Sequence, residues 1–326
     1  MNQNNNIENN KKLPWTYFIS VISVNQCSIN NDFEGIRLNS DGIIYTTDVS
    51  RKYLMKRYMK DELEINIAGL PDKTSNGMYQ YLKNNKDLIK TLESFPKKPT
   101  EQLEIMNNKY KDISMFGYLF TDTFGNGKNE DKNSKIELKN STLTGYVQVS
   151  NGINIGNNNN IINMTIINGN KDKDTSTSKK NKENEEENEE ESNNFNEKLK
   201  SGSVGSKQII EEAYIANTVF VNPNQYRENF CLFNDIENIK ENFEKDISTI
   251  ETTLTNDANS FRTASRNNIF NEILIKIQSD VALNIGKQPL VFENGKIVLS
   301  TKLQNKINEL KDKNNIVVTE ILNETK

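Results

Sequence analysis

The residues of this chain best suited to chemistry are four cations that lie close together, Arg51, Lys52, Lys56 and Arg57. The side chain of Asp48, just before them, can accept hydrogen bonds from the first backbone amides of a helix, so we expect a helix from about Val49 to Lys60. Lysine and arginine on one helix can neutralise successive phosphates of a polymer. The segment therefore indicates an anionic polymer as partner, and a solvated basic surface is the open alternative.

The expected helix has two unlike faces, because successive residues lie about 100° apart around its axis. The cationic stripe consists of Lys52, Lys56 and Lys60, with Arg57 beside them. The opposite arc consists of Leu54, Met55 and Tyr58. Arg51 also lies on the apolar arc, but its long stem could reach a bound ligand from the first turn. We therefore expect one face in the core and one face toward the partner.

Composition narrows the possible functions. The net charge is −4, and residues 171–191 alone hold nine acidic residues and five lysines, so the rest of the chain is neutral. A polyanion would therefore be held by local patches rather than by a global field. The chain contains no histidine, which excludes Ser-His and Cys-His nucleophile pairs and the commonest zinc ligand.

The cysteines and the polar N-terminus indicate a cytoplasmic protein. Cys27 and Cys231 are isolated, without CxxC spacing, which is typical of reduced, partly buried thiols with no chemical role. Residues 1–12 are polar, and no stretch approaches the ~18 to 20 apolar residues of a membrane span. We expect neither secretion nor membrane insertion, and neither a metal ion nor another cofactor.

Hydrophobic periodicity predicts the elements that position these residues. Strands are expected at 17–24, 114–120, 143–149, 161–167, 213–221, 269–277 and 316–322. Helices are expected at 49–60, 235–257 and 301–311. Residues 17–24, rich in β-branched and aromatic side chains, should be buried on both faces. Residues 61–112 indicate an inserted excursion with one or two short helices, because they contain Pro71, Pro96 and Pro99.

The order of these elements predicts the fold class. Strand, helix, strand, strand, helix and strand, with insertions, is the split βαβ or ferredoxin-like plan, an α+β fold with an antiparallel sheet. RNA-recognition modules are built on this plan. In the long helix, the apolar residues at spacings that favour a core face are Ile236, Ile239, Phe243, Ile247, Ile250 and Leu254.

Strands on either side of a charged tract predict a long β-hairpin. Residues 170–200 combine low hydrophobicity with high charge and cannot repay the entropy of ordering. We therefore expect a disordered tip, with residues 161–167 before it and the segments 208–210 and 213–221 after it. The acidic tip should project to solvent, because it would repel a bound polyanion.

Four segments carry a resemblance to one protein family. They are Thr47-Asp48 with the basic helix, Asp112-Ile113-Ser114-Met115-Phe116-Gly117, Thr144-Gly145-Tyr146-Val147-Gln148-Val149-Ser150 and Phe261-Arg262-Thr263-Ala264-Ser265-Arg266. In order, they are similar to a threonine-aspartate helix start, an aspartate-x-x-x-phenylalanine-glycine strand, a glycine-proline-valine-glutamine strand and a serine-alanine-arginine turn. The chain thus resembles the backbone-subunit family of type I CRISPR Cascade complexes, in the RAMP superfamily and near its type I-B-like branch.

The sequence departs from the family pattern at two places. Tyr146 stands where the family has proline. Residues 25–31 replace a glycine-aspartate-proline-rich loop after the first strand, of which Phe33-Glu34-Gly35 is only a fragment. The subtype within the family therefore stays open.

The resemblance implies a ferredoxin-like palm with fingers and a thumb. The implied parts are a disordered N-terminus (1–14), the first half of the palm (15–60), a finger-like insertion (61–112), palm strands (113–153), a thumb hairpin (154–212) with its acidic tip (170–200), and the second half of the palm (213–326). It also implies a non-catalytic subunit that oligomerises along CRISPR RNA and presents the guide for pairing with target DNA. Its partners would be CRISPR RNA, target DNA, further copies of itself and other Cascade subunits.

The residues that the resemblance implies as RNA-binding fall into four groups. Phosphate contacts on the basic helix would come from Arg51, Lys52, Lys56 and Arg57. Hydrogen bonds at a strand end would come from Gln148, Ser150 and Asn151, although Gln148 could instead pair with neighbouring backbone. An apolar wedge beside a displaced base would comprise Ile161, Ile162, Met164 and Val204. Further phosphate contacts would come from Lys207 and Arg266, for which a plain hairpin base and surface turn is the alternative.

Two other functions stay open. Related backbone subunits of type III complexes cut target RNA with an aspartate in a loop, and the candidates here are Asp32, Asp41, Asp48 and Asp122. That metal-assisted chemistry needs no histidine. The third possibility is a self-assembling filament or tube whose hairpin adds a strand to a neighbouring copy. It predicts polymers without nucleic acid, whereas the RNA-binding function predicts assemblies that need RNA.

Overall fold

The computed structural model describes residues 13–29, 35–70, 72–73, 79–80, 110–120, 141–167, 204–233, 238–260 and 268–324. The N-terminus up to residue 12 and the acidic tip at 170–200, both predicted to be disordered, lie outside these ranges. Most of the insertion predicted at 61–112 and the predicted turn from Arg262 to Arg266 also lie outside them.

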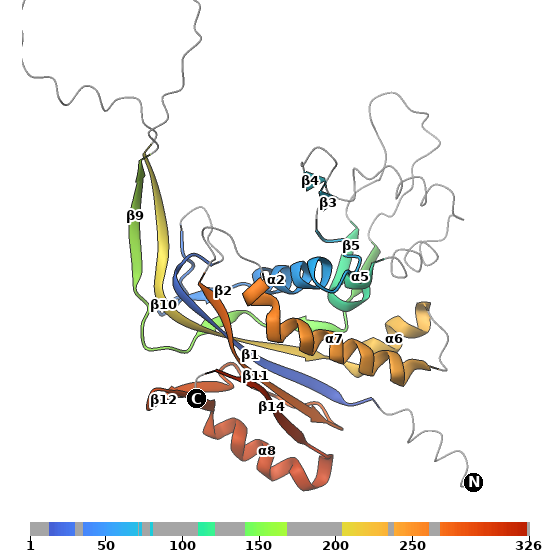
Figure 1. Ribbon diagram of the computed structural model, residues 1–326. Coiled ribbons are helices and arrows are strands. Elements are labelled where there is room, and N and C mark those ends of the chain that lie inside the picture. The colour runs from blue at the N-terminus through green and yellow to red at the C-terminus, as the bar shows by residue number, and fades with distance from the viewer. Residues whose placement is uncertain are drawn as a thin grey trace, which may run out of the picture.

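Most of the strands belong to one sheet. They are β1 (Trp15–Cys27), β2 (Tyr45–Thr46), β7 (Val147–Val149), β8 (Gly152–Asn154), β9 (Ile161–Ile167), β10 (Val204–Val221), β11 (Ile269–Ser279) and β14 (Val317–Asn323). Their order is β14-β11-β1-β10-β8-β2, with β7 and β9 also paired to β10. Every pairing is antiparallel. The predicted mixture of helices with a large antiparallel sheet is confirmed (Figure 1).

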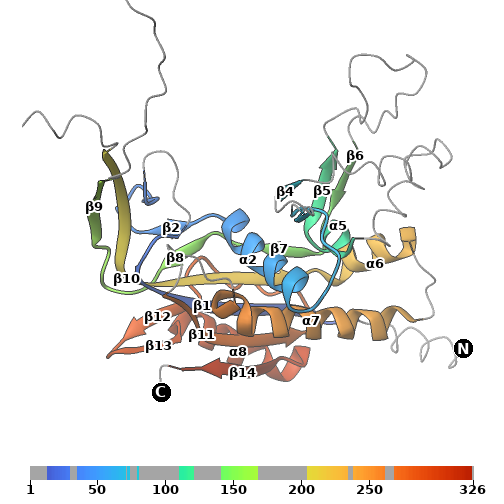
Figure 2. The same cartoon turned by 45° about the horizontal axis from the view of Figure 1, so that its top comes forward.

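Layers cover both faces of this sheet (Figure 2). One face carries α2 (Asp48–Asp61) and α7 (Ile239–Ser260). The other carries α8 (Thr301–Asn314) and a hairpin of β12 (Leu290–Glu293) and β13 (Lys296–Leu299). The remaining elements are β3 (Asp72–Lys73), β4 (Tyr79–Gln80), α5 (Lys111–Phe116), β5 (Gly117–Phe120), β6 (Ser141–Thr144) and α6 (Pro223–Phe233).

β1 lies between the two layers, which explains its composition. Phe18 is fully buried beneath the helices, in a cluster that includes Phe243 of α7. Tyr17 and Ile19 are buried on the other face, with Leu303 of α8. Because successive side chains of a strand point to opposite faces, such a strand must be apolar on both sides. The prediction of a first strand buried on both faces is confirmed.

α7 follows the predicted long helix with shifted ends. It runs from Ile239 to Ser260 rather than from 235 to 257. Its side chains Phe243, Ile247 and Ile250 are buried in the cluster against the sheet, as the apolar spacing predicted. Ile236 lies outside the described residues.

β9 and β10 form the predicted hairpin. Their register pairs Ile161 with Ile210 at the base and Ile167 with Val204 toward the tip. β10 has 18 residues and unites the predicted segments 208–210 and 213–221 in one strand. The same strand continues into the main sheet, where it pairs with β1. Figure 1 shows the hairpin projecting beyond the layers of the main sheet.

Two glycines account for departures from the predicted strands. Residues 114–120 form the end of α5 and then β5, because Gly117 ends the helix at φ +82°, which L side chains rarely adopt. The strand predicted at 143–149 is interrupted at Gly145, between β6 and β7. The backbone at Met115–Gly117 approaches so closely there that a Cβ would collide with it. The sequence reasoning also missed α6 and the β12–β13 hairpin. No helix within the described ranges has the length and apolarity to span a membrane.

Candidate nucleic-acid interface

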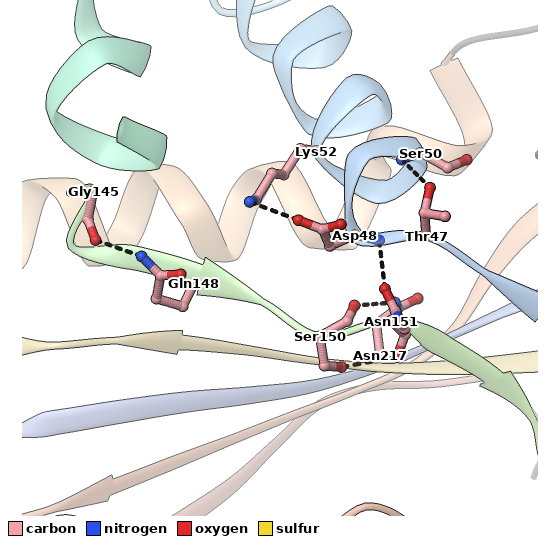
Figure 3. Close-up of polar contacts among 9 residues, drawn as sticks. All are labelled: Thr47, Asp48, Ser50, Lys52, Gly145, Gln148, Ser150, Asn151 and Asn217. Atoms are coloured by element: carbon pink, nitrogen blue, oxygen red, sulfur yellow. Dashed lines mark hydrogen bonds and ion pairs between the residues drawn. The ribbon is translucent and has the colours of Figure 1, made fainter. Parts of the chain in front are cut away.

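The start of α2 meets the end of β7 (Figure 3). Thr47 caps the helix, since its Oγ1 accepts a hydrogen bond from Ser50 N at 3.3 Å. The prediction that Asp48 is the cap is wrong, because Asp48 is already helical and its carboxylate turns to Lys52. The backbone N–H of Asp48 instead donates to Asn151 Oδ1 at 3.1 Å. This contact brings the predicted cations of α2 beside the predicted polar residues that follow β7.

Two cations of α2 have partners that a phosphate could replace. Lys52 Nζ lies 2.9 Å from Asp48 Oδ2, and both side chains are partly exposed. Arg57 Nη2 lies 2.6 Å from Asp61 Oδ2 in the same one-turn arrangement. Ion pairs of this kind contribute roughly 0.3–0.5 kcal/mol. Exchanging the carboxylate for a phosphate would therefore cost little, and the contact of both residues with RNA stays a prediction.

Lys56 is held more firmly. Its Nζ lies 3.0 Å from Oδ2 of Asp112, whose carboxylate is fully buried. The same carboxylate accepts hydrogen bonds from the amides of Ala68 and Gly69, at 2.7 and 2.9 Å. The Lys56 ammonium also lies 5.4 Å from the centre of the Phe116 ring. Lys56 thus joins α2 to α5. The sequence predicted a phosphate contact for Lys56 but not this structural role.

Arg51 departs most from the prediction. Its side chain is 1% exposed, with Nη1 3.1 Å from Asp257 Oδ1 and Nη2 donating to Ser20 Oγ at 2.8 Å. Burial raises the pKa of Asp257 to about 6, and the neighbouring Arg51 guanidinium opposes that rise. The expectation that Arg51 contacts a bound polymer is corrected here, because the residue joins α2, α7 and β1 in the interior. The helical wheel had already placed it on the apolar arc.

The polar residues after β7 are tied to neighbouring backbone (Figure 3). Ser150 and Asn151 are exposed. Ser150 Oγ donates to the carbonyl of Asn151 at 3.0 Å, while the carbonyl of Ser150 accepts from Asn217 Nδ2 at 3.0 Å. Gln148 Nε2 donates to the carbonyl of Gly145 at 2.7 Å, so the open alternative of local backbone pairing holds for Gln148. These contacts fix the side chains that border the start of α2.

The predicted wedge residues form a second group on the hairpin. Met164 is 46% exposed and Ile162 40% exposed, which is unusual for apolar side chains of this size. Ile161 packs against a buried cluster at the base, and the partly exposed Lys207 lies opposite Met164 in the register. The predicted contacts whose side chains lie outside the described residues are Val204 and Arg266.

α2 also presents two exposed residues that the sequence reasoning missed. Val49 is 67% exposed and Tyr53 37% exposed, one turn apart. Aromatic side chains beside cations are typical of single-strand nucleic-acid interfaces, because every base has a face that can stack. The signal was available, since Tyr53 directly follows Lys52 in the segment expected to face a polymer.

Tyr146, which departs from the family pattern, has a structural partner. Its hydroxyl donates to Asp246 Oδ2 at 2.6 Å, and Lys111 Nζ lies 2.8 Å from the same oxygen. Burial, followed by the charge of Asp246, raises the pKa of Tyr146 well above its ordinary value. The tyrosine therefore joins the segment before β7 to α7 through a buried hydrogen bond.

The candidate nuclease aspartates do not form a described cluster. Asp41 is exposed and Asp48 pairs with Lys52, whereas Asp32 and Asp122 lie outside the described residues. In the described part of the chain, no three cysteine, aspartate or glutamate side chains lie close enough together to hold a metal ion.

Comparisons with known proteins find similar chains among solved structures. No curated protein matches the sequence. A chain of a structure titled "CRISPR RNA-guided surveillance complex, pre-nicking" is 10% identical with TM-score 0.49, covering 96% of this chain and 94% of that chain. A chain of a "CRISPR RNA-guided surveillance complex" is 9% identical with TM-score 0.43, covering 93% and 87%. A chain of a "Type III-B Cmr-beta bound to cognate target RNA" is 8% identical with TM-score 0.34, covering 84% and 64%.

The sequence itself matches the family described as "CRISPR-associated protein Cas7". The match runs over residues 15–319, from the first residue of β1 into β14. It therefore includes the main sheet, α2 and the hairpin. This chain belongs to the Cas7 family of CRISPR-associated proteins.

Proposed function

We propose that this chain is a non-catalytic CRISPR RNA-binding subunit that forms the backbone of a type I Cascade complex. The observation that carries the proposal is the Cas7 family match over residues 15–319. Several copies would coat one CRISPR RNA beside other Cascade subunits and present it for pairing with target DNA. In such an arrangement the protein reads the shape of the nucleic acid, while base pairing reads its sequence.

We infer that the centre of the main sheet is the ferredoxin-like palm. In chain order, β1, β7 with β8, β10 and β11 are its four strands, and their spatial order is β11-β1-β10-β8. α2 follows the first of these strands and α7 follows the third. Both helices pack on one face, as the split βαβ plan requires. This order supports the palm, with the β9–β10 hairpin as the thumb.

The groups around the start of α2 are suited to hold an RNA backbone without reading its sequence. Lys52 and Arg57 would exchange their carboxylate partners for phosphates at little cost, because both ion pairs are partly exposed and span one turn of the helix. Ser150 and Asn151 lie exposed beside them and can bond to 2′-hydroxyls or phosphates. Tyr53 offers a ring on the same helix.

The hairpin supports a different kind of contact. Ile162 and Met164 expose apolar surface on an arm that projects beyond the sheet (Figure 1). An apolar side chain can wedge beside any base, so such a contact tolerates every guide sequence. Lys207 lies across from Met164 and could neutralise a nearby phosphate.

Expression of the chain with its genomic neighbours tests the proposal directly. The particle is purified and sized, and its RNA is sequenced. We expect a homogeneous RNA that carries a repeat-derived end and several protein copies. Polymers free of nucleic acid would favour a filament or tube protein instead. Cleavage of target RNA that requires a divalent metal would favour a type III-like nuclease.

Matched variants assign the interface. We expect the double variant Lys52→Ala, Arg57→Ala to bind RNA more weakly. The negative slope of log affinity against log salt should become less steep by about 1.4, since each phosphate contact to a single strand contributes about 0.7. Lys302→Ala on α8, across the sheet, is the control and should leave the slope unchanged. An unchanged slope in the double variant would place the RNA elsewhere.

A further inference from the structure

A cleft of about 600 Å³ lies on the face of the main sheet away from α2 and α7. Its floor is formed by β1, β10 and the β7–β8 segment, and its wall is the chain between β11 and β12. This volume falls within the roughly 300–1,000 Å³ typical of small-ligand pockets. Of the RNA contacts predicted from the sequence, Gln148, Ser150 and Asn151 line it, whereas the predicted cations of α2 and Lys207 do not.

Aromatic side chains line the cleft from the two central strands. Trp15 and Tyr17 come from β1, and Phe220 comes from β10. The rings of Tyr17 and Phe220 are 6.2 Å apart and inclined by 30°. Tyr17 is fixed, because its hydroxyl accepts a hydrogen bond from Leu283 N at 2.7 Å. Aromatic residues on the two central strands of a four-stranded ferredoxin-like sheet are the surface on which RNA-recognition modules stack bases.

The rim of the cleft carries polar side chains that can bond to a nucleotide. Gln148, Ser150 and Asn151 border it on one side, and the exposed Lys287 borders it on the other. None of the described residues that line it carries a carboxylate, although the whole chain has 45 acidic residues. Amide and hydroxyl side chains can bond to the edges of a base, and a lysine can neutralise the attached phosphate.

Asn151 joins this cleft to the start of α2. Its side-chain oxygen accepts the N–H of Asp48 at 3.1 Å, and the same residue lines the cleft. Figure 3 shows it at the end of β7, where the strand passes the first turn of the helix. An extended strand that leaves the α2 surface could therefore turn over this edge and place its next base in the cleft.

We propose that the cleft binds one nucleotide of single-stranded RNA, with the base stacked on Phe220 and Trp15 and the phosphate beside Lys287. The site shares Gln148, Ser150 and Asn151 with the predicted strand-end contacts, and it adds Trp15, Phe220 and Lys287 to the contacts on α2 and on the hairpin. It rests on the proposed function only for naming RNA as the ligand. An aromatic side chain of a partner protein is the competing occupant, and the experiment separates the two.

The chain provides its own reporter, because Trp15 is its only tryptophan. A short oligoadenylate, and separately adenosine monophosphate, is titrated into the full-length protein while Trp15 emission is recorded. The anisotropy of a labelled copy of the oligonucleotide is followed in parallel, so that RNA binding anywhere on the protein is measured independently. We expect saturable quenching of Trp15 by both ligands, since a stacked base quenches an indole.

Matched variants locate the effect. Phe220→Ala should weaken the quenching titration by about 5- to 150-fold, the range expected for loss of one stacked base. Phe292→Ala should leave it unchanged, because Phe292 stacks on Tyr214 on the same face but does not line the cleft. Lys287→Ala should weaken binding of the oligonucleotide, and Lys302→Ala should not. Circular dichroism checks that each variant is folded.

Three results would overturn the inference. The first is that anisotropy detects RNA binding while Trp15 emission stays unchanged. This result would leave the proposed function intact. The second is a quenching titration that neither Phe220→Ala nor Phe292→Ala changes. The third is that Trp15 is shielded from solvent in the assembled particle and cross-links to protein but not to RNA. This result would identify a partner protein in the cleft. Quenching by the mononucleotide would support the cleft even if the particle contained no CRISPR RNA.

Discussion

Replacing Arg51 by methionine separates the buried role found here from a role in RNA binding. The guanidinium forms an ion pair with Asp257 at 3.1 Å and donates a hydrogen bond to Ser20 Oγ at 2.8 Å, and both ionic side chains are at most 1% exposed. Arg51→Met would leave the Asp257 carboxylate buried without its cation. Breaking a buried pair in this way costs about 3–5 kcal/mol of unfolding free energy. Since the unfolding entropy is about 2.1 cal/mol/K per residue, this loss lowers the Tm of a 326-residue chain by roughly 4–7 °C.

Urea unfolding and thermal melts measure this loss, and two further variants control it. In Arg51→Met with Asp257→Leu, the uncompensated charge is gone, so most of the stability should return. Lys52→Met, one residue along the same helix, removes only a partly exposed pair and should cost less than about 1 kcal/mol. The reasoning is refuted if Arg51→Met unfolds at the wild-type urea concentration but binds RNA more weakly.

Three other perturbations test contacts described above. Burial raises the pKa of Asp257 from 3.8 to about 6, so its stabilising contribution is complete below about pH 3.8 and is lost as the pH rises to 6. Unfolding free energy should fall by on the order of 1 kcal/mol between pH 5 and 7, and Asp257→Asn, measured by urea unfolding, should flatten that change. Asp112→Ala should cost about 3–5 kcal/mol, because it leaves the Lys56 ammonium and two amides without their acceptor; a loss below 1 kcal/mol in denaturant unfolding would contradict this. Gly145→Ala should reduce the yield of folded protein sharply, since the Met115 carbonyl occupies the space for its Cβ, and wild-type yield and melting would show that this junction can open.

The sequence was sufficient where one element carries its own signal. The apolar composition of β1 identifies it because this strand is covered on both faces, and the regular spacing in α7 identifies it because this helix packs one face against the sheet. Strands on either side of the charged tract likewise identify the β9–β10 hairpin. The order of these elements was enough to anticipate a large antiparallel sheet.

The sequence was insufficient where two distant segments meet. A helical wheel places the cations of α2 around the helix axis. It does not show that Asp257 neutralises Arg51 or that Asp112 neutralises Lys56. The break at Gly145 depends on the approach of another turn, which local propensity cannot report. The cleft beside Phe220 was missed for the same reason, because only the strand order brings its residues together.

The continuity of β10 has a mechanical consequence. The strand's 18 residues, at about 3.3 Å each, span roughly 60 Å and belong to the main sheet and the hairpin alike. Because no turn interrupts β10, the hairpin is anchored in the main sheet through a continuous strand. We expect it to bend elastically rather than to rotate about a hinge. A load on Met164 would then reach the backbone hydrogen bonds between β10 and β1, and every copy of the protein would carry an arm of the same reach.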